Sequence, residues 1–90
     1  MTVATRAVWK FPFGESPGVA TLKMPRDTQI LAAQMQAGML CMWGLVNPHA
    51  TTAERRFLVV GTGWHVPEFK QFVATVQDGR FVWHVFEVPL

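Results

Sequence analysis

The hydrophobic pattern of this chain consists of short apolar segments separated by glycine and proline. Residues 6–13, 19–24 and 55–61 are rich in aliphatic and aromatic side chains, and a glycine or proline closes or follows each of them. Segments of this length, bounded by turn residues, are typical of β-strands. Polar loops are expected at 14–18 and 47–53. The pattern therefore predicts a protein built from short strands.

The apolar segment 39–46 and the segment before it predict a β-hairpin. Ala37 and Gly38 suit a two-residue loop between them. This register would place Met35 opposite Leu40, Ala33 opposite Met42, and Ala32 opposite Trp43. A helix over 28–36 is the alternative, because Asp27 or Thr28 could cap it and apolar residues follow at helical spacing. We favour the strand, because the same segment also alternates and leads directly into the loop.

The C-terminal segment predicts a second hairpin around Asp78-Gly79, a pair that suits a type I′ turn. Counting outward from that turn gives the pairs Gln77–Arg80, Val76–Phe81, Ala74–Trp83, Phe72–Val85 and Lys70–Glu87. The apolar members of these pairs share one face, which we expect to be core. Lys70 and Glu87 would close that face as an opposite-charge pair. His84 falls on the other, half-exposed face.

Together these segments predict one all-β domain over residues 1–90. The strands are expected to be mainly antiparallel, about six or seven in number, with at most one short helix. The expected architecture is a small β-sandwich or a partly open barrel. Half of the residues are hydrophobic, and edge strands in so small a sheet invite pairing with another copy. We therefore expect a homo-oligomer, a dimer or larger.

Charge and hydropathy narrow the classes of partner. The net charge is +2, and Arg55-Arg56 is the one basic cluster, so nucleic-acid binding is not expected. The apolar run 39–46 is far shorter than a spanning helix requires, and residues 1–6 lack the apolar region of a signal peptide. These features predict neither a signal peptide nor a membrane partner. Cys41 is the one cysteine, and its apolar surroundings predict a buried core residue.

The segment Gly61–Glu68 is the strongest candidate for a binding site. Thr62 supplies a hydroxyl, Trp64 a flat aromatic face, and His65 a titratable donor or acceptor. The two glycines allow a bulge or a sharp bend there. The alternative is a turn that merely ends a strand and folds Trp64 onto the core. The residues leave both interpretations open.

The remaining candidates are charged or titratable side chains. Arg55 and Arg56 would point to opposite faces of their strand, so one of them could hold an anion while the other is solvated. The histidines, His84 among them, lack the spacing of metal ligands, so no metal site is expected. We expect no catalytic residues, no cofactor and no enzymatic activity. The predicted ligand-binding residues are Arg55, Arg56, Thr62, Trp64, His65 and His84.

Four ordered blocks of the sequence are similar to a family of small bacteriophage and prophage proteins. The blocks are WKFP at 9–12, CxWxLVxP at 41–48, GTGxxxP at 61–67 and FVxHVFE at 81–87. The chain departs from this family at Trp64, where the family often carries histidine. The resemblance implies a phage accessory protein in the host cytoplasm, of the kind that acts in counter-defence. Such a protein would sequester a small anionic, nucleotide-type ligand or, alternatively, block a host defence protein through an apolar patch or edge strand.

Overall fold

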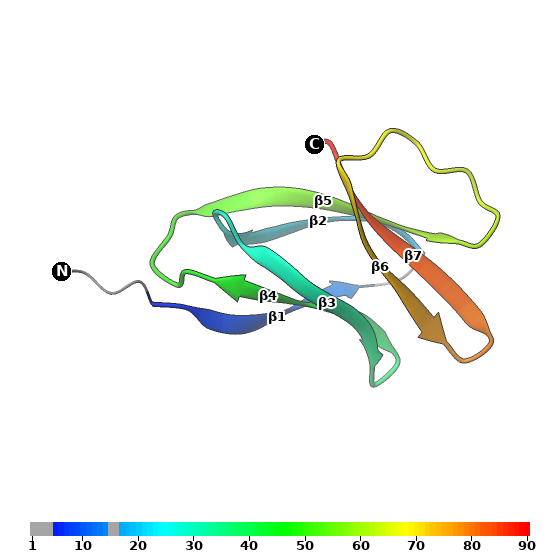
Figure 1. Ribbon diagram of the computed structural model, residues 1–90, viewed down its shortest axis with the longest axis horizontal. Helices are drawn as coiled ribbons and strands as arrows, with labels where there is room; N and C mark the ends of the chain where they lie inside the picture. The colour runs from blue at the N-terminus through cyan, green and yellow to red at the C-terminus, as the bar shows by residue number, and fades with distance from the viewer. Residues whose placement is uncertain (1–4, 15–16) are drawn as a thin grey trace.

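The computed structural model describes residues 5–14 and 17–90, and these residues form antiparallel strands without a helix. Part of the predicted loop at 14–18 lies outside the described residues. The strands are β1 (Ala7–Gly14), β2 (Gly18–Pro25), β3 (Gln29–Gln36), β4 (Met39–Val46), β5 (Thr52–Gly61), β6 (Gln71–Asp78) and β7 (Phe81–Val88) (Figure 1). The predicted all-β fold is confirmed. β5 begins at Thr52, inside the predicted loop 47–53.

The strands form two sheets that face each other. The three-stranded sheet has the order β1-β4-β3, and the four-stranded sheet has the order β2-β5-β7-β6. The edge strands β3 and β6 of the two sheets lie side by side (Figure 1), although no ladder between them is recorded in the described part of the chain. The architecture is therefore a small sandwich that approaches a barrel along one side.

The core lies between the sheets and explains the alternation in the sequence. Phe57 and Val59 on β5 and Val85 on β7 face inward and are fully buried, and Leu40 and Met42 of β4 meet them from the other sheet. Because successive side chains of a strand point to opposite faces, Leu58 between them points outward. Cys41 is buried, as predicted.

The β3–β4 hairpin has the predicted register. Gln36 pairs with Met39, and the predicted pairs Met35–Leu40, Ala33–Met42 and Ala32–Trp43 are all present. Ala37 and Gly38 have φ angles of 51° and 78°, as a type I′ turn requires of both central residues. Residues 29–36 are therefore a strand, and the alternative helix is wrong.

The register predicted for the β6–β7 hairpin is wrong. Asp78 pairs with Phe81, so the two-residue loop is Gly79-Arg80, and Val76 pairs with Trp83. Gly79 has a φ of 58° whereas Arg80 is not among the described residues with positive φ, which fits a type II′ turn with glycine in the first central position. A bulge between Phe72 and Ala74 then shifts Phe72 to the outer face. Val76 and Val85 are buried as predicted, but Phe72 and Phe81 are exposed.

Candidate functional site

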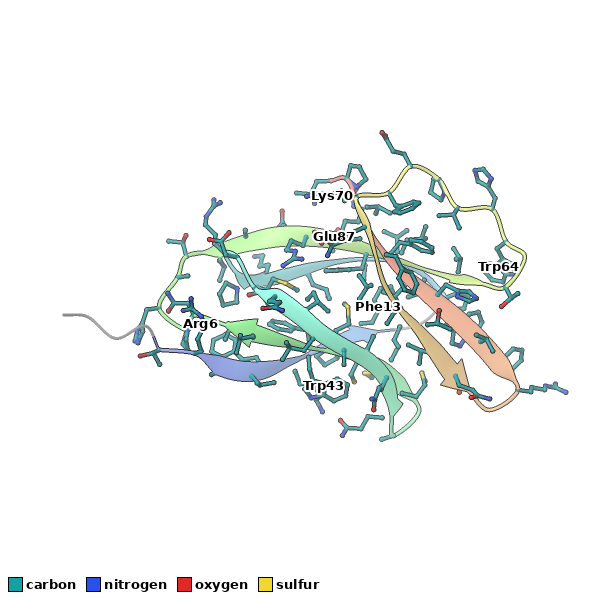
Figure 2. All side chains as sticks on the ribbon, viewed as in Figure 1. Arg6, Phe13, Trp43, Trp64, Lys70 and Glu87 are labelled. Carbon is teal, nitrogen blue, oxygen red and sulfur yellow. The ribbon has the colours of Figure 1, made fainter. Side chains whose placement is uncertain are left out.

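Two hollows lie toward opposite ends of β5, and both involve residues predicted to bind a ligand. We call the first the aromatic cleft; it is lined by Gly61, Thr62, Trp64, Arg80, Phe81, Val82 and Trp83 and has a volume of about 330 Å³. We call the second the charged cavity; it is lined by Arg26, Asp27, Thr28, Ala53, Arg55, Lys70, Gln71 and Glu87 and has a volume of about 600 Å³. Figure 2 shows how far Trp64 of the first lies from Lys70 and Glu87 of the second.

Three aromatic rings form the wall of the aromatic cleft. Trp83 lies in the middle, with Phe81 stacked on it at 5.7 Å between ring centroids and Trp64 edge-on at 6.0 Å. The indole Nε1 of Trp83 donates a hydrogen bond to Oδ2 of Asp78 at 3.1 Å, which holds the central ring in place. Trp64 and Phe81 are 54% and 52% exposed. The cleft therefore combines one fixed ring with two open ones.

The glycines of the Gly61–Glu68 segment determine where Trp64 lies. A Cβ added at Gly61 would meet the indole of Trp64 at 2.9 Å, so a side chain there would displace the ring. The backbone N of Trp64 donates to the carbonyl of Gly61 at 3.2 Å, and Gly63 has a φ of 86°, which favours glycine. The segment is thus a tight turn that rests Trp64 on Gly61 and against Trp83 while leaving about half of it in solvent.

The polar groups near the cleft are organised around His84. Its ring atoms Nε2 and Nδ1 lie 2.9 Å from Oγ1 of Thr62 and 3.1 Å from Oγ1 of Thr75. These contacts tie the turn after β5 to strands β7 and β6. The guanidinium of Arg80 lies over the ring of Phe81 at 5.5 Å from its centroid, so a cation borders the aromatic wall.

The structure brings together only part of the predicted binding set. Thr62 and Trp64 line the aromatic cleft, and His84 contacts Thr62 without lining it. The neighbouring His65 is exposed and does not line the cleft either. Arg55 lines the charged cavity. Arg56 lies on the opposite face of β5, where its Nε donates to Oγ1 of Thr21 at 3.4 Å.

Sequence reasoning missed four residues of the cleft, Arg80, Phe81, Val82 and Trp83. The alternation of the strand places Phe81 and Trp83 on the core face of the hairpin in either register, and the wrong turn assignment placed Arg80 in the first strand pair. A signal was available, because glycine at the first central position is typical of a type II′ turn. That assignment would have moved Arg80 into the loop.

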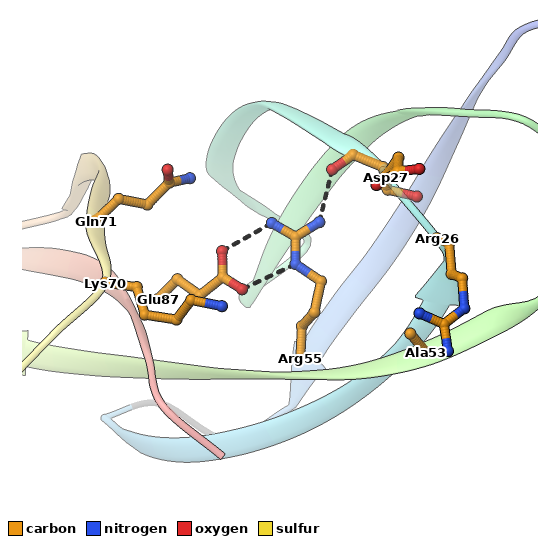
Figure 3. A pocket seen from close by; sticks show the side chains of 8 residues that line it. Arg26, Asp27, Ala53, Arg55, Lys70, Gln71 and Glu87 are labelled. Carbon is orange, nitrogen blue, oxygen red and sulfur yellow. Dashed lines mark hydrogen bonds and ion pairs between the residues drawn. The ribbon is translucent and has the colours of Figure 1, made fainter.

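The charged cavity is built on one arginine that connects three segments (Figure 3). Arg55 donates from Nε to Oε2 of Glu87 at 2.9 Å and from Nη2 to Oε1 at 2.7 Å. Its Nη1 donates to the carbonyl oxygen of Thr28 at 2.6 Å. This two-point carboxylate contact is the strong geometry for an arginine. The predicted side-chain partner of Glu87, Lys70, is replaced by Arg55, although the backbone N of Lys70 donates to the Glu87 carbonyl at 2.7 Å.

The carboxylate of Glu87 is kept ionised by its surroundings. The hydrogen bond from Arg55 lowers the pKa of Glu87 below its ordinary value, and the positive charges of Arg55 and Lys70 act in the same direction. Burial opposes this effect, because it penalises the charged form. The side chains of Arg55 and Glu87 are 20% and 6% exposed. The ion pair at the open end of the sandwich therefore joins a buried carboxylate to a partly buried guanidinium.

Thr28 supports the cavity from behind. Its hydroxyl donates to the carbonyl of Pro25 at 2.6 Å, and it is buried. A Cβ added at Gly44 would lie 2.6 Å from Cγ2 of Thr28, so β4 must carry glycine there for Thr28 to keep its place. The position of Arg55 thus depends on packing across the sandwich.

A comparison with known proteins identifies the family of this chain. A family model described as a domain of unknown function, DUF7352, matches residues 4–90, and the chain belongs to that family. No curated protein and no solved structure matches the chain. Within the described residues, no group of three or more His, Cys, Asp or Glu side chains could hold a metal ion. The same part of the chain contains no helix long and apolar enough to span a bilayer.

Proposed function

We propose that this member of the DUF7352 family binds a small ligand that has a planar ring and an anionic group, of nucleotide type, in the aromatic cleft. One observation carries the proposal. Two half-exposed rings, Trp64 and Phe81, flank the fixed ring of Trp83 beside the guanidinium of Arg80. Exposed aromatic rings on a hollow surface are typical of ligand sites, because they leave apolar area in water until a ligand covers it.

A planar ring is the part of the ligand that the aromatic wall would hold. Stacking of a base on an aromatic side chain contributes about 1–3 kcal/mol, and every base has a face that can stack. Trp64 offers its free surface at the edge of the cleft, and Trp83 is fixed by its bond to Asp78. The fixed ring lowers the entropic cost of binding, because it needs no ordering when the ligand arrives.

An anionic group is the part that the polar rim would hold. Arg80 and Thr62 both line the cleft, and a guanidinium and a hydroxyl are suitable donors to a phosphate oxygen. His84 holds the hydroxyl of Thr62 at 2.9 Å, so it acts as a positioning residue. Arg55, the predicted phosphate holder, is engaged with Glu87 and takes no part at this site.

The proposal includes the biological setting implied by the four sequence blocks. In it the protein is a phage accessory protein that sequesters a nucleotide-type ligand in the host cytoplasm, as an oligomer and without converting it. Calorimetric titration with cyclic dinucleotides and adenosine-ribose derivatives tests the binding. Trp64→Ala should raise the dissociation constant at least about tenfold, because it removes one stacking surface.

A matched control is available for this test. Trp9 is also exposed, at 41%, but lies on β1 in the other sheet. Trp9→Ala should leave the dissociation constant within about twofold, since it removes an indole that the cleft does not contain. Equal affinity for Trp64→Ala and the unaltered chain, or no heat with any compound of the panel, would refute the proposal.

A second candidate function, binding of a host protein, is favoured by the outer face of the four-stranded sheet. The register places one apolar residue of every strand in a single row, which we call the outer row: Val19, Leu58, Phe86 and Phe72. Phe69 packs on Phe86 at 4.8 Å between ring centroids. A stoichiometric host partner that is lost on Phe72→Glu but kept on Trp64→Ala would support this function over ligand binding. The reverse pattern would exclude the outer row.

A further inference from the structure

We propose that the charged cavity is a second binding site, independent of the aromatic cleft, and that its ligand is a phosphate-type oxyanion. Three cationic side chains from three separate segments line this cavity: Arg26 from the turn after β2, Arg55 from β5, and Lys70 from the residue before β6. Figure 3 shows Arg26 and Lys70 on either side of the Arg55 guanidinium.

The charges of the lining residues leave an excess of positive charge. Glu87 is already neutralised by the two hydrogen bonds from Arg55. Asp27 is the other carboxylate of the lining, and its single negative charge is outnumbered by the positive charges of Arg26 and Lys70. A net positive cavity with low-dielectric walls attracts an anion more strongly than the same charges on a flat surface.

Arg55 is prepared to donate one more hydrogen bond. A guanidinium has five N–H groups, and Arg55 directs three of them to oxygens of Glu87 and Thr28. A further Nη1 contact reaches Sδ of Met24 at 3.5 Å. One N–H of Nη2 is left over, on a side chain that lines the cavity and is held rigidly by its other bonds. A donor fixed in this way loses little entropy when a ligand binds.

Lys70 and Gln71 supply the remaining donors. The backbone of Lys70 is bonded to Glu87, but its ammonium forms no salt bridge or hydrogen bond with the residues that the structure describes. Gln71 follows it in the chain, lines the same cavity and is exposed. Arg26 donates from Nε to Oγ1 of Thr51 at 3.1 Å, which leaves its terminal nitrogens for a ligand.

The arrangement of donors favours a tetrahedral oxyanion. The donors come from different sides of the cavity, and phosphate presents oxygens in several directions, whereas a carboxylate presents two in one plane. Ammonium and guanidinium groups together are common phosphate binders. The volume of about 600 Å³ accommodates a phosphate with an organic group attached. Free phosphate and a phosphate monoester share this chemistry.

Calorimetric titration of the full chain at constant ionic strength tests the proposal with inorganic phosphate, glycerol phosphate and acetate. Phosphate should bind saturably and more tightly than acetate, and the response to glycerol phosphate distinguishes a monoester site from a site for the free ion. Lys70→Gln and Arg26→Gln should each raise the dissociation constant for phosphate about fivefold to tenfold, because each removes a charge-assisted hydrogen bond.

Two controls make the result specific. Lys23 is exposed on β2 and does not line the cavity, so Lys23→Gln should change the affinity by less than about twofold although it removes the same charge. Trp64→Ala should leave phosphate binding unchanged, which separates this site from the aromatic cleft. Absence of saturable binding, or equal weakening by Lys23→Gln and Lys70→Gln, would overturn the proposal. Thermal unfolding without phosphate checks that each variant is folded.

Discussion

The aromatic cleft and the charged cavity share one sheet but are built on opposite physical principles. In the charged cavity, Glu87 is buried and Arg55 partly buried, and the two hydrogen bonds between them are already formed in the free protein. In the aromatic cleft, Trp64 and Phe81 remain half in solvent. Removing one member of the ion pair leaves the other charge without its partner. Removing a ring from the aromatic cleft exposes little surface that was buried before. The Arg55–Glu87 pair of the cavity should therefore contribute strongly to stability, whereas the open rings of the cleft should contribute to ligand binding and little to stability.

The largest expected effect is on the ion pair. Glu87→Ala should lower the free energy of unfolding by about 2–4 kcal/mol, because it removes two charge-assisted hydrogen bonds and leaves the partly buried Arg55 charge without its carboxylate. The double variant Arg55→Met/Glu87→Leu should recover most of that loss, since it removes both charges. Urea unfolding monitored by tryptophan fluorescence measures both. A loss below about 1 kcal/mol for Glu87→Ala would show that the cavity does not stabilise the fold as described.

Low pH should lower the stability of the fold through the same ion pair. The hydrogen bond from Arg55 lowers the pKa of Glu87 from its ordinary value of 4.5, so the folded state favours the ionised form more than the unfolded state does. The resulting stability is fully present above pH 4.5 and is lost as the pH falls through the lower, folded pKa. Urea unfolding across this range should show the decline. Glu87→Gln should flatten that slope, and an unchanged slope would assign the acid sensitivity to other carboxyls.

A substitution at Gly44, in the three-stranded sheet, should have an effect of intermediate size on stability. Gly44→Ala should cost about 1–3 kcal/mol, because the new Cβ would lie 2.6 Å from Cγ2 of Thr28. Thr28→Ser removes that methyl group and keeps the hydroxyl that donates to Pro25. The double variant should therefore be more stable than Gly44→Ala alone by denaturant unfolding. Additive losses would show that Thr28 is not the residue that Gly44 accommodates.

The smallest effect on stability should come from the cleft. Gly61→Ala should cost about 1 kcal/mol or less, because the half-exposed Trp64 can move away from a Cβ that would lie 2.9 Å from its indole. Binding of the nucleotide-type ligand should nevertheless weaken, since Trp64 leaves its place against Trp83. In a Trp64→Ala background, Gly61→Ala should no longer affect binding. A large loss of stability would mean that the cleft supports the core, and the contrast with the charged cavity would fail.

Local turn chemistry accounts for what the sequence could and could not predict. The Ala37-Gly38 loop fixed the β3–β4 register correctly, because both residues adopt the positive φ of a type I′ turn. At the other hairpin Asp78-Gly79 suits such a turn equally well, but Gly79 occupies the first loop position. The residues of β6 therefore pair further along β7 than the sequence predicts. Phe81 pairs with Asp78 at the end of the hairpin, where it is exposed. The alternation of apolar and polar residues cannot distinguish the two registers, because the side chains between the turn and the bulge lie on the same face of the sheet in both.

The candidate site also contains residues that a local sequence pattern predicts and residues that it does not. The Gly61–Glu68 segment was found from the sequence because its glycines and Trp64 are contiguous. Arg55 was grouped with it, although the rise of a strand places Arg55 about 20 Å from Gly61. Its true partners, Glu87 and the Thr28 carbonyl, come from distant segments. Trp83 entered the cleft through its pairing with Gly61, which no local pattern encodes.

The most direct test of ligand binding at the aromatic cleft uses the indole N–H signals of the four tryptophans. Trp64 and Trp83 line the cleft, whereas Trp9 and Trp43 lie in the three-stranded sheet. Each indole gives its own signal in a proton–nitrogen NMR spectrum, so one titration with adenosine monophosphate reports on both sheets at once. We expect saturable shifts of the Trp64 and Trp83 signals while those of Trp9 and Trp43 stay in place. No shift, or shifts confined to Trp9 and Trp43, would contradict the account.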